Sequence, residues 1–199
     1  MMSKAAAKIF LRLNNVRVVD HNEGNWPAKC VVPTAPHTSN RDFPYGIYAR
    51  AYMQVYIKFA AKDSLFKGPA GAVLKSLGGV PVVRSRRTNF VEAVANIFAE
   101  REEFKLCVAP EGTRSKVDKF KTGFYFIALR AKVPMVFAKF DFGNRVIEFS
   151  KPWWPSGDIR ADFDHIYRHY DGVEGLVAEN SFDYDPAVLD ALPEVRDLI

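Results

Sequence analysis

The chain has 199 residues, 48% of them hydrophobic and 14% aromatic, which suits one folded domain with a sizeable core and excludes a disordered chain. Its net charge of +5 is uneven: residues 1–150 hold 24 Lys and Arg against 12 acidic residues, and residues 151–199 hold 4 against 11. A basic body indicates an anionic partner, such as nucleic acid, anionic lipid headgroups or a phosphorylated cofactor.

Cysteine and histidine usage narrows the chemistry and the location. Cys30 and Cys107 lie in apolar runs, which predicts buried thiols in a reducing compartment and not a disulfide framework. The four histidines have no companion cysteines at zinc-ligand spacing, so we expect no metal and no resident cofactor. No apolar run reaches the ~20 residues that span a bilayer. We therefore expect a cytoplasmic protein that is peripheral on the membrane.

Residues 1–14 predict a short amphipathic helix. Its apolar face holds Ala5, Ala6, Ile9, Phe10 and Leu13, and the basic residues Lys4, Lys8 and Arg12 lie elsewhere around the axis. Such a helix suits a membrane surface, but it suits packing on the domain equally well. The sequence leaves both possibilities open.

The next elements surround a histidine and an aspartate. A short strand is expected near residues 16–18, a buried strand at 28–34, and a helix from 44 to about 59 with a tyrosine on every turn of one face. His37 and Asp42 lie between the last two elements. A turn followed by a first helical turn can bring the carboxylate against the imidazole, as in a general base held by an orienting acid. The alternatives are a surface histidine and an aspartate that caps the helix.

Strands and helices then alternate through residue 140. We expect strands at 57–61, 80–84, 105–109, 134–138 and 146–149, the last two forming a hairpin, and helices ending near 77, 100 and 131. This pattern predicts a single α/β domain with a mostly parallel mixed sheet flanked by helices. Residues 151–199 predict an acidic helical tail whose basic residues Arg160, His165, Arg168 and His169 lie on the surface.

Polar side chains follow three of the expected strands, where active sites of parallel sheets gather. His37 and Asp42 follow one, Arg84 the second, and the run from Pro110 to Arg114 the third. Arginine side chains are forked donors for anions, Gly112 would let backbone amides approach an anion, and Lys121 is a further candidate ligand. The alternatives are surface ion pairs for the arginines and, for Glu111, an acceptor of backbone amides.

These motifs resemble, in order and spacing, the four blocks of the glycerolipid acyltransferases, and most of all the lysophosphatidic acid (1-acyl-glycerol-3-phosphate) acyltransferases. The blocks are His37-x4-Asp42, Arg84 after Gly79 to Val83, Pro110 to Arg114, and Val133 to Val136. The resemblance covers about residues 28–150. Two features depart from it: Phe137 stands where the fourth block usually has a second proline, and a short amphipathic segment stands where many members have a pair of membrane helices.

The resemblance implies a catalytic His37 and Asp42 and an acceptor phosphate bound by the second and third blocks, that is by Arg84, Glu111, Gly112, Thr113 and Arg114, with Lys121 beside them. The implied activity is transfer of a fatty acyl group from acyl-CoA or acyl-carrier protein to a lysophospholipid at a membrane surface, in phospholipid biosynthesis. Another lysolipid or a glycolipid alcohol is the alternative acceptor. A basic nucleic-acid-binding module is the rival of another class, but the sequence has no nucleic-acid motif, so we expect no nucleic-acid partner.

Overall fold

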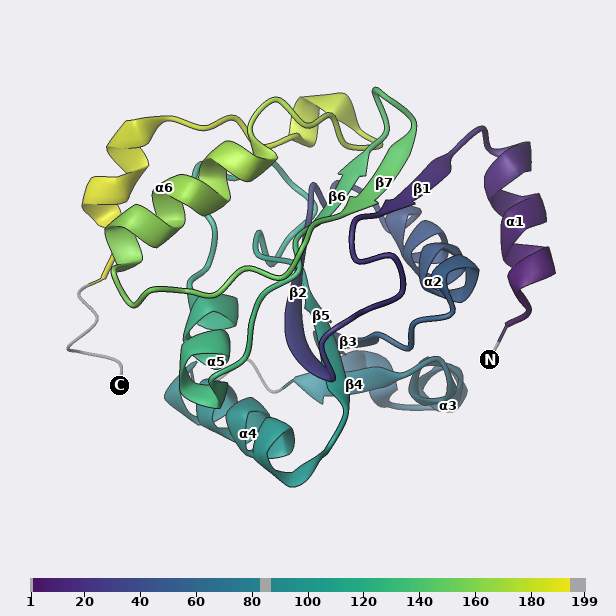
Figure 1. Cartoon of the computed structure of the whole chain (residues 1–199), viewed down its shortest axis with the longest axis horizontal. Helices are drawn as coiled ribbons and strands as arrows, with labels where there is room; N and C mark the ends of the chain where they lie inside the picture. Colours follow the sequence, from purple (N-terminus) through teal and green to yellow (C-terminus); the bar gives the residue numbers. More distant parts are fainter. Residues whose placement is uncertain (1, 83–86, 194–199) are drawn as a thin grey trace.

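Strands and helices alternate along the chain and build one mostly parallel sheet with helices on both faces (Figure 1). The computed structural model describes residues 2–82 and 87–193. The strands are β1 (Arg17–Asp20), β2 (Lys29–Ala35), β3 (Lys58–Lys62), β4 (Gly79–Val82), β5 (Phe104–Val108), β6 (Ala138–Asp141) and β7 (Val146–Phe149). The α-helices are α1 (Lys4–Leu13), α2 (Asp42–Met53), α3 (Pro69–Ser76), α4 (Arg87–Glu100), α5 (Gly123–Ala131) and α6 (Ile159–Tyr170), and 3₁₀ helices span Asp63–Phe66, Ala178–Asn180 and Pro186–Ala191.

The strand order within the described residues is β1-β7-β6-β2-β5-β3-β4, which places β2 in the middle of the sheet. Neighbouring strands are parallel except for the β6–β7 hairpin. The α/β class and the mostly parallel mixed sheet predicted from the sequence are thereby confirmed. None of the helices in the described ranges is both long and apolar enough to cross a membrane.

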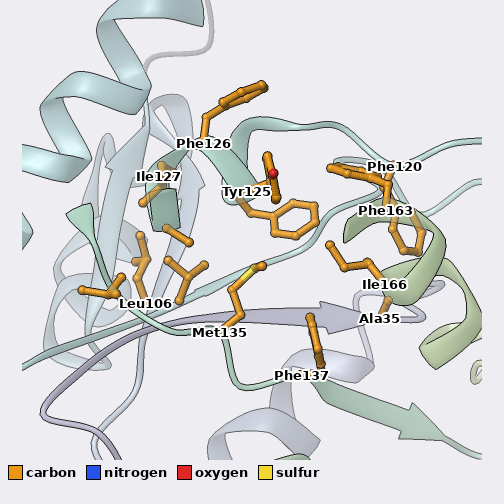
Figure 2. Packing of buried hydrophobic residues seen from close by; sticks show 14 of the residues in the cluster. Ala35, Leu106, Phe120, Tyr125, Phe126, Ile127, Met135, Phe137, Phe163 and Ile166 are labelled. Atoms are coloured by element: carbon orange, nitrogen blue, oxygen red, sulfur yellow. The ribbon is translucent and has the colours of Figure 1, made fainter. Parts of the chain in front are cut away.

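Alternating side chains of β2 belong to two separate hydrophobic cores. Val31 packs with buried residues of α4, α5 and α6, whereas Cys30 and Val32 pack on the opposite face with α1 and α2. This is the period of two expected of a strand buried on both faces. Figure 2 shows the first core, to which Leu106 of β5, Tyr125 of α5 and Phe163 of α6 contribute.

Helix α2 is shorter than the sequence suggested. It ends at Met53, because Gln54 takes a left-handed conformation (φ 61°) and the chain turns back towards β3. Tyr45 and Tyr48 pack against Phe10 of α1, with ring centroids 5.3 and 3.7 Å away. The tyrosine face therefore holds the N-terminal helix on the domain.

Arg50 of α2, which the helical pattern places on the polar side, is buried. Its guanidinium donates hydrogen bonds to the carbonyl oxygens of Ile57 (2.5 Å) and Leu77 (2.7 Å). Ile57 directly precedes β3, and Leu77 directly follows α3. The early end of α2 brings these carbonyl oxygens within reach of the guanidinium. Burial also lowers the pKa of the Arg50 side chain.

The hairpin is present, but its first strand lies further along the chain than expected. Met135 makes only isolated bridges to Val31 and Trp153, and β6 begins at Ala138. Residues 133–138 are all buried, so the apolar run does not mark where the strand starts. His169 was expected on the surface, but it is half-buried against Phe137. No local sequence pattern indicates this burial.

Candidate active site

The central strand β2 ends at Ala35, and His37 follows it at the carboxyl edge of the sheet. Nδ1 of His37 lies 3.1 Å from Oδ2 of Asp42, the first residue of α2. The backbone N–H of Ser39 donates to the same oxygen (2.9 Å). The predicted pair therefore lies on a corner of six residues, 37–42, which we call the catalytic corner after the role predicted for it.

Burial differs sharply between the two partners. The Asp42 side chain is 2% exposed, whereas that of His37 is 25% exposed. A carboxylate partner requires Nδ1 to carry the proton, so Nε2 keeps the lone pair. An imidazole that is held through Nδ1 and carries a lone pair on Nε2 has the geometry of a general base.

The side chain of Glu111 contacts the backbone of this corner. It follows β5, the parallel neighbour of β2, and both of its carboxylate oxygens accept from the backbone N–H of His37, at 3.0 and 2.9 Å. The side chain is 3% exposed. Burial raises its pKa to about 7; the hydrogen bond from His37 lowers it, and the negative charge of Asp42 raises it further. Glu111 thus takes the role of backbone acceptor that the sequence left as an alternative, and its part in substrate binding stays a prediction.

The loop after Glu111 folds back on itself. The backbone N–H of Lys121 donates to the carbonyl oxygen of Pro110 (2.8 Å), which closes the loop at its base. Gly112 has a φ of +66°, and a Cβ there would lie 2.6 Å from Nζ of Lys121. The backbone angle favours glycine at this position, and the lysine side chain that passes over it would have to shift to admit a larger residue.

The predicted phosphate ligands are described to different extents. Lys121 lies beside Gly112, the residue that follows Glu111 in the chain. Thr113 and Arg114 follow in the same loop and are exposed. Arg84, the predicted ligand after β4, lies outside the described residues.

The tail contributes contacts that sequence reasoning did not find. The hydroxyl of Tyr170 donates to the carbonyl oxygen of Pro33 near the end of β2 (2.8 Å), and Oγ1 of Thr38 accepts from the backbone N–H of Val177 (3.0 Å). The hydroxyl of Tyr167 accepts from the backbone N–H of Phe120 (3.2 Å). These residues are far from the corner in sequence, and no motif marks them.

Comparison with known proteins points to one family. The family model described as acyltransferase matches residues 17–137, a range that includes His37, Asp42, Glu111 and Lys121. The human 1-acyl-sn-glycerol-3-phosphate acyltransferase beta is 29% identical over 109 residues, covering 52% of this chain and 39% of the human protein. A probable 1-acyl-sn-glycerol-3-phosphate acyltransferase of Mycoplasma pneumoniae is 31% identical over 139 residues, covering 64% of this chain and 50% of that protein.

A solved structure has a similar fold. It is the 1-acyl-sn-glycerophosphate (LPA) acyltransferase from Thermotoga maritima, which superposes with a TM-score of 0.57 over 88% of this chain and 78% of its own. The sequence identity is 19%, so this likeness concerns the fold. The chain spans half or less of the length of the two curated relatives named above.

Proposed function

Because this chain belongs to the acyltransferase family, we propose that it moves a fatty acyl group from acyl-CoA or acyl-carrier protein to the free hydroxyl of a lysophospholipid. The expected acceptor is 1-acyl-glycerol-3-phosphate, and the expected setting is phospholipid biosynthesis. The names of the human and Mycoplasma relatives support this acceptor. The hydrogen-bonded His37–Asp42 pair at the end of the central strand is the observation that carries the proposal.

In this mechanism His37 is the general base. Nε2 takes the proton of the acceptor hydroxyl as its oxygen attacks the carbonyl carbon of the thioester. The tetrahedral intermediate then expels the thiolate as the carbon–sulfur bond breaks, and the imidazolium returns the proton to the sulfur. Asp42 holds the tautomer and stabilises the imidazolium, and base catalysis of this kind contributes roughly 10²–10⁴-fold in rate.

The loop after β5 is the expected place of the acceptor phosphate. Lys121 brings an ammonium group to the side of Gly112, and Arg114 supplies a guanidinium that can bind a phosphate through two hydrogen bonds. In this proposal Thr113 and Arg84 complete the phosphate site, and Glu111 keeps His37 in place beside it. A neutral glycolipid alcohol or another lysolipid remains the alternative acceptor.

We also propose that the chain works at a membrane surface from the cytoplasmic side. Ile9 and Leu13 on α1 are 60% and 82% exposed, although both are large apolar residues. Lys4, Lys8 and Arg12 lie on the same helix, and each cation adds ~1 kcal/mol of attraction near an anionic surface. The free thiols Cys30 and Cys107 support the cytoplasmic location.

An acyl-transfer assay with an acceptor panel tests the function. The purified protein would be incubated with acyl-CoA or acyl-carrier protein donors and with phosphate-bearing or neutral lysolipids, and the products identified by mass spectrometry. We expect the diacyl product of 1-acyl-glycerol-3-phosphate, and we expect His37→Ala to lower kcat by about 10²–10⁴-fold. A folded His37→Ala variant with near-normal turnover would exclude the mechanism, and preference for neutral acceptors would exclude the phosphate site.

A further inference from the structure

Residues 174–182, here called the strap, cross the carboxyl edge of the sheet beside the catalytic corner. At its start, the carbonyl oxygen of Glu174 accepts from the backbone N–H of Phe142, just after β6 (2.8 Å). At its end, Phe182 is buried against Phe120, with ring centroids 4.4 Å apart, in the loop that also carries Glu111. The strap therefore connects the β6–β7 turn with the loop after β5, and it lies outside the matched range of the family.

Between these two anchors the strap touches the residue that follows His37. The backbone N–H of Val177 donates to Oγ1 of Thr38 (3.0 Å), a residue that is itself buried. A Cβ at Gly175 would lie 2.5 Å from Cγ2 and 2.7 Å from Oγ1 of Thr38. The backbone of the strap thus approaches the corner closely, and the approach depends on a missing side chain at Gly175.

The chemistry of the strap suits an apolar part of a substrate. Leu176 and Val177 are partly exposed, and the charged residues of the strap, Glu174 and Glu179, are both acidic and exposed. Carboxylates repel a phosphate, and the cations expected to bind one, Lys121 and Arg114, lie on the loop after β5 instead. The phosphate side and the strap side of the site are therefore chemically distinct.

We propose that the strap is the wall along which the transferred acyl chain lies next to His37. Leu176 and Val177 are its specificity-determining residues, because their size limits the length and bulk of the chain. Thr38 and Gly175 are positioning residues, because they fix the distance between the strap and the catalytic corner. This inference rests on the proposed acyl transfer and adds to it the element that selects the donor.

The test measures kcat/KM for acyl donors of increasing chain length. Leu176→Ala enlarges the space beside the strap and should raise the ratio of long-chain to short-chain kcat/KM by roughly tenfold. Leu176→Phe should lower this ratio by a similar factor. A roughly tenfold change is the discrimination that a pocket shows for about one methylene. Leu192→Ala is the matched control, since Leu192 is also partly buried in the tail but outside the strap. Its chain-length profile should equal that of the wild type.

Thr38 is tested by a conservative pair of variants. Thr38→Ser keeps the acceptor for the Val177 N–H and Thr38→Val removes it, so kcat should be lower in Thr38→Val than in Thr38→Ser, with no rise in the KM of the lysolipid. Wild-type transfer with unchanged profiles in both Leu176 variants would overturn the strap and leave the proposed function intact. A profile shift in Leu192→Ala equal to that in Leu176→Ala would also overturn it. Absence of transfer by the wild type would refute the proposed function, and this inference with it.

Discussion

Glu111 joins the third sequence block to the first through its two hydrogen bonds with the backbone of His37. Its pKa of about 7 is above the ordinary value of 4.5, so the folded protein binds more protons than the unfolded chain between these two pH values. The sign of the linkage follows: the free energy of unfolding should fall as pH rises from about 4.5 to 7, by at most ~1.4 kcal/mol per pH unit.

Urea unfolding of the wild type and of Glu111→Gln, compared between about pH 5 and pH 8, checks this prediction. Glutamine cannot titrate, so the variant should lack this part of the slope. His169 acts in the opposite sense, since burial lowers its pKa to about 4 and stability is lost as pH falls from about 6.5 towards that value. It is present in both proteins and cancels in the difference. Parallel pH profiles would show that Glu111 does not titrate in this range.

The residues differ in how far the sequence predicts them. His37 and Asp42 are five positions apart on a single corner, so local chain geometry was enough to pair them. The contact of Glu111 with the His37 backbone depends on the pairing of β2 with β5, which no local pattern reveals. The burial of Arg50 could not be predicted for the same reason, because its partners are the carbonyl oxygens of Ile57 and Leu77.

Helix α1 has two faces with different partners. Ala7 and Leu11 are buried in the core, and Phe10 stacks on Tyr48, whereas Ile9 and Leu13 face solvent. The sequence placed Phe10 on one apolar face with Ile9 and Leu13, but the tyrosines of α2 cover Phe10 alone. One side of the helix therefore packs on the domain, and binding of the exposed side to a membrane surface stays a prediction.

This division predicts two separable phenotypes. The double change Ile9→Ser and Leu13→Ser should weaken binding to anionic vesicles while leaving the free energy of unfolding within ~0.5 kcal/mol of wild type. Leu11→Ala should cost about 2–5 kcal/mol of stability. Liposome flotation at low and high salt, with urea unfolding in parallel, measures both effects. Equal flotation of the double variant and the wild type would place the anchor elsewhere, for example at Trp154, which is 61% exposed.

At the scale of the whole molecule, the acidic tail is a structural part of the domain. Phe163 of α6 is fully buried, and its ring meets those of Phe124, Tyr125 and Tyr167. Phe163→Ala should therefore lower the free energy of unfolding by about 3–5 kcal/mol. Asp190→Ala, which removes only an exposed ion pair with Arg160, should change it by at most ~1 kcal/mol. Thermal and urea unfolding of both variants decide whether the tail supports the core.

The overall class followed from the alternation of strands and helices, but the order of the strands did not. β1 pairs with β7, and β2 lies between β5 and β6, so the sheet is completed by segments far apart in sequence. The tail could not be placed because its aromatic residues repeat no motif, and its contacts appear only once the sheet exists. Sequence patterns thus predicted the His37–Asp42 pair better than they predicted the segments that surround it.

The late position of the tail has a consequence for the newly made protein. Synthesis runs from the N-terminus, so His37 and Asp42 leave the ribosome long before Tyr170 and Val177 can contact β2 and Thr38. A nascent chain that already carries His37 and Asp42 still lacks the segment that contacts the carboxyl edge of the sheet. A chain interrupted before Tyr170 therefore holds this pair without the contacts that the tail adds to β2 and Thr38.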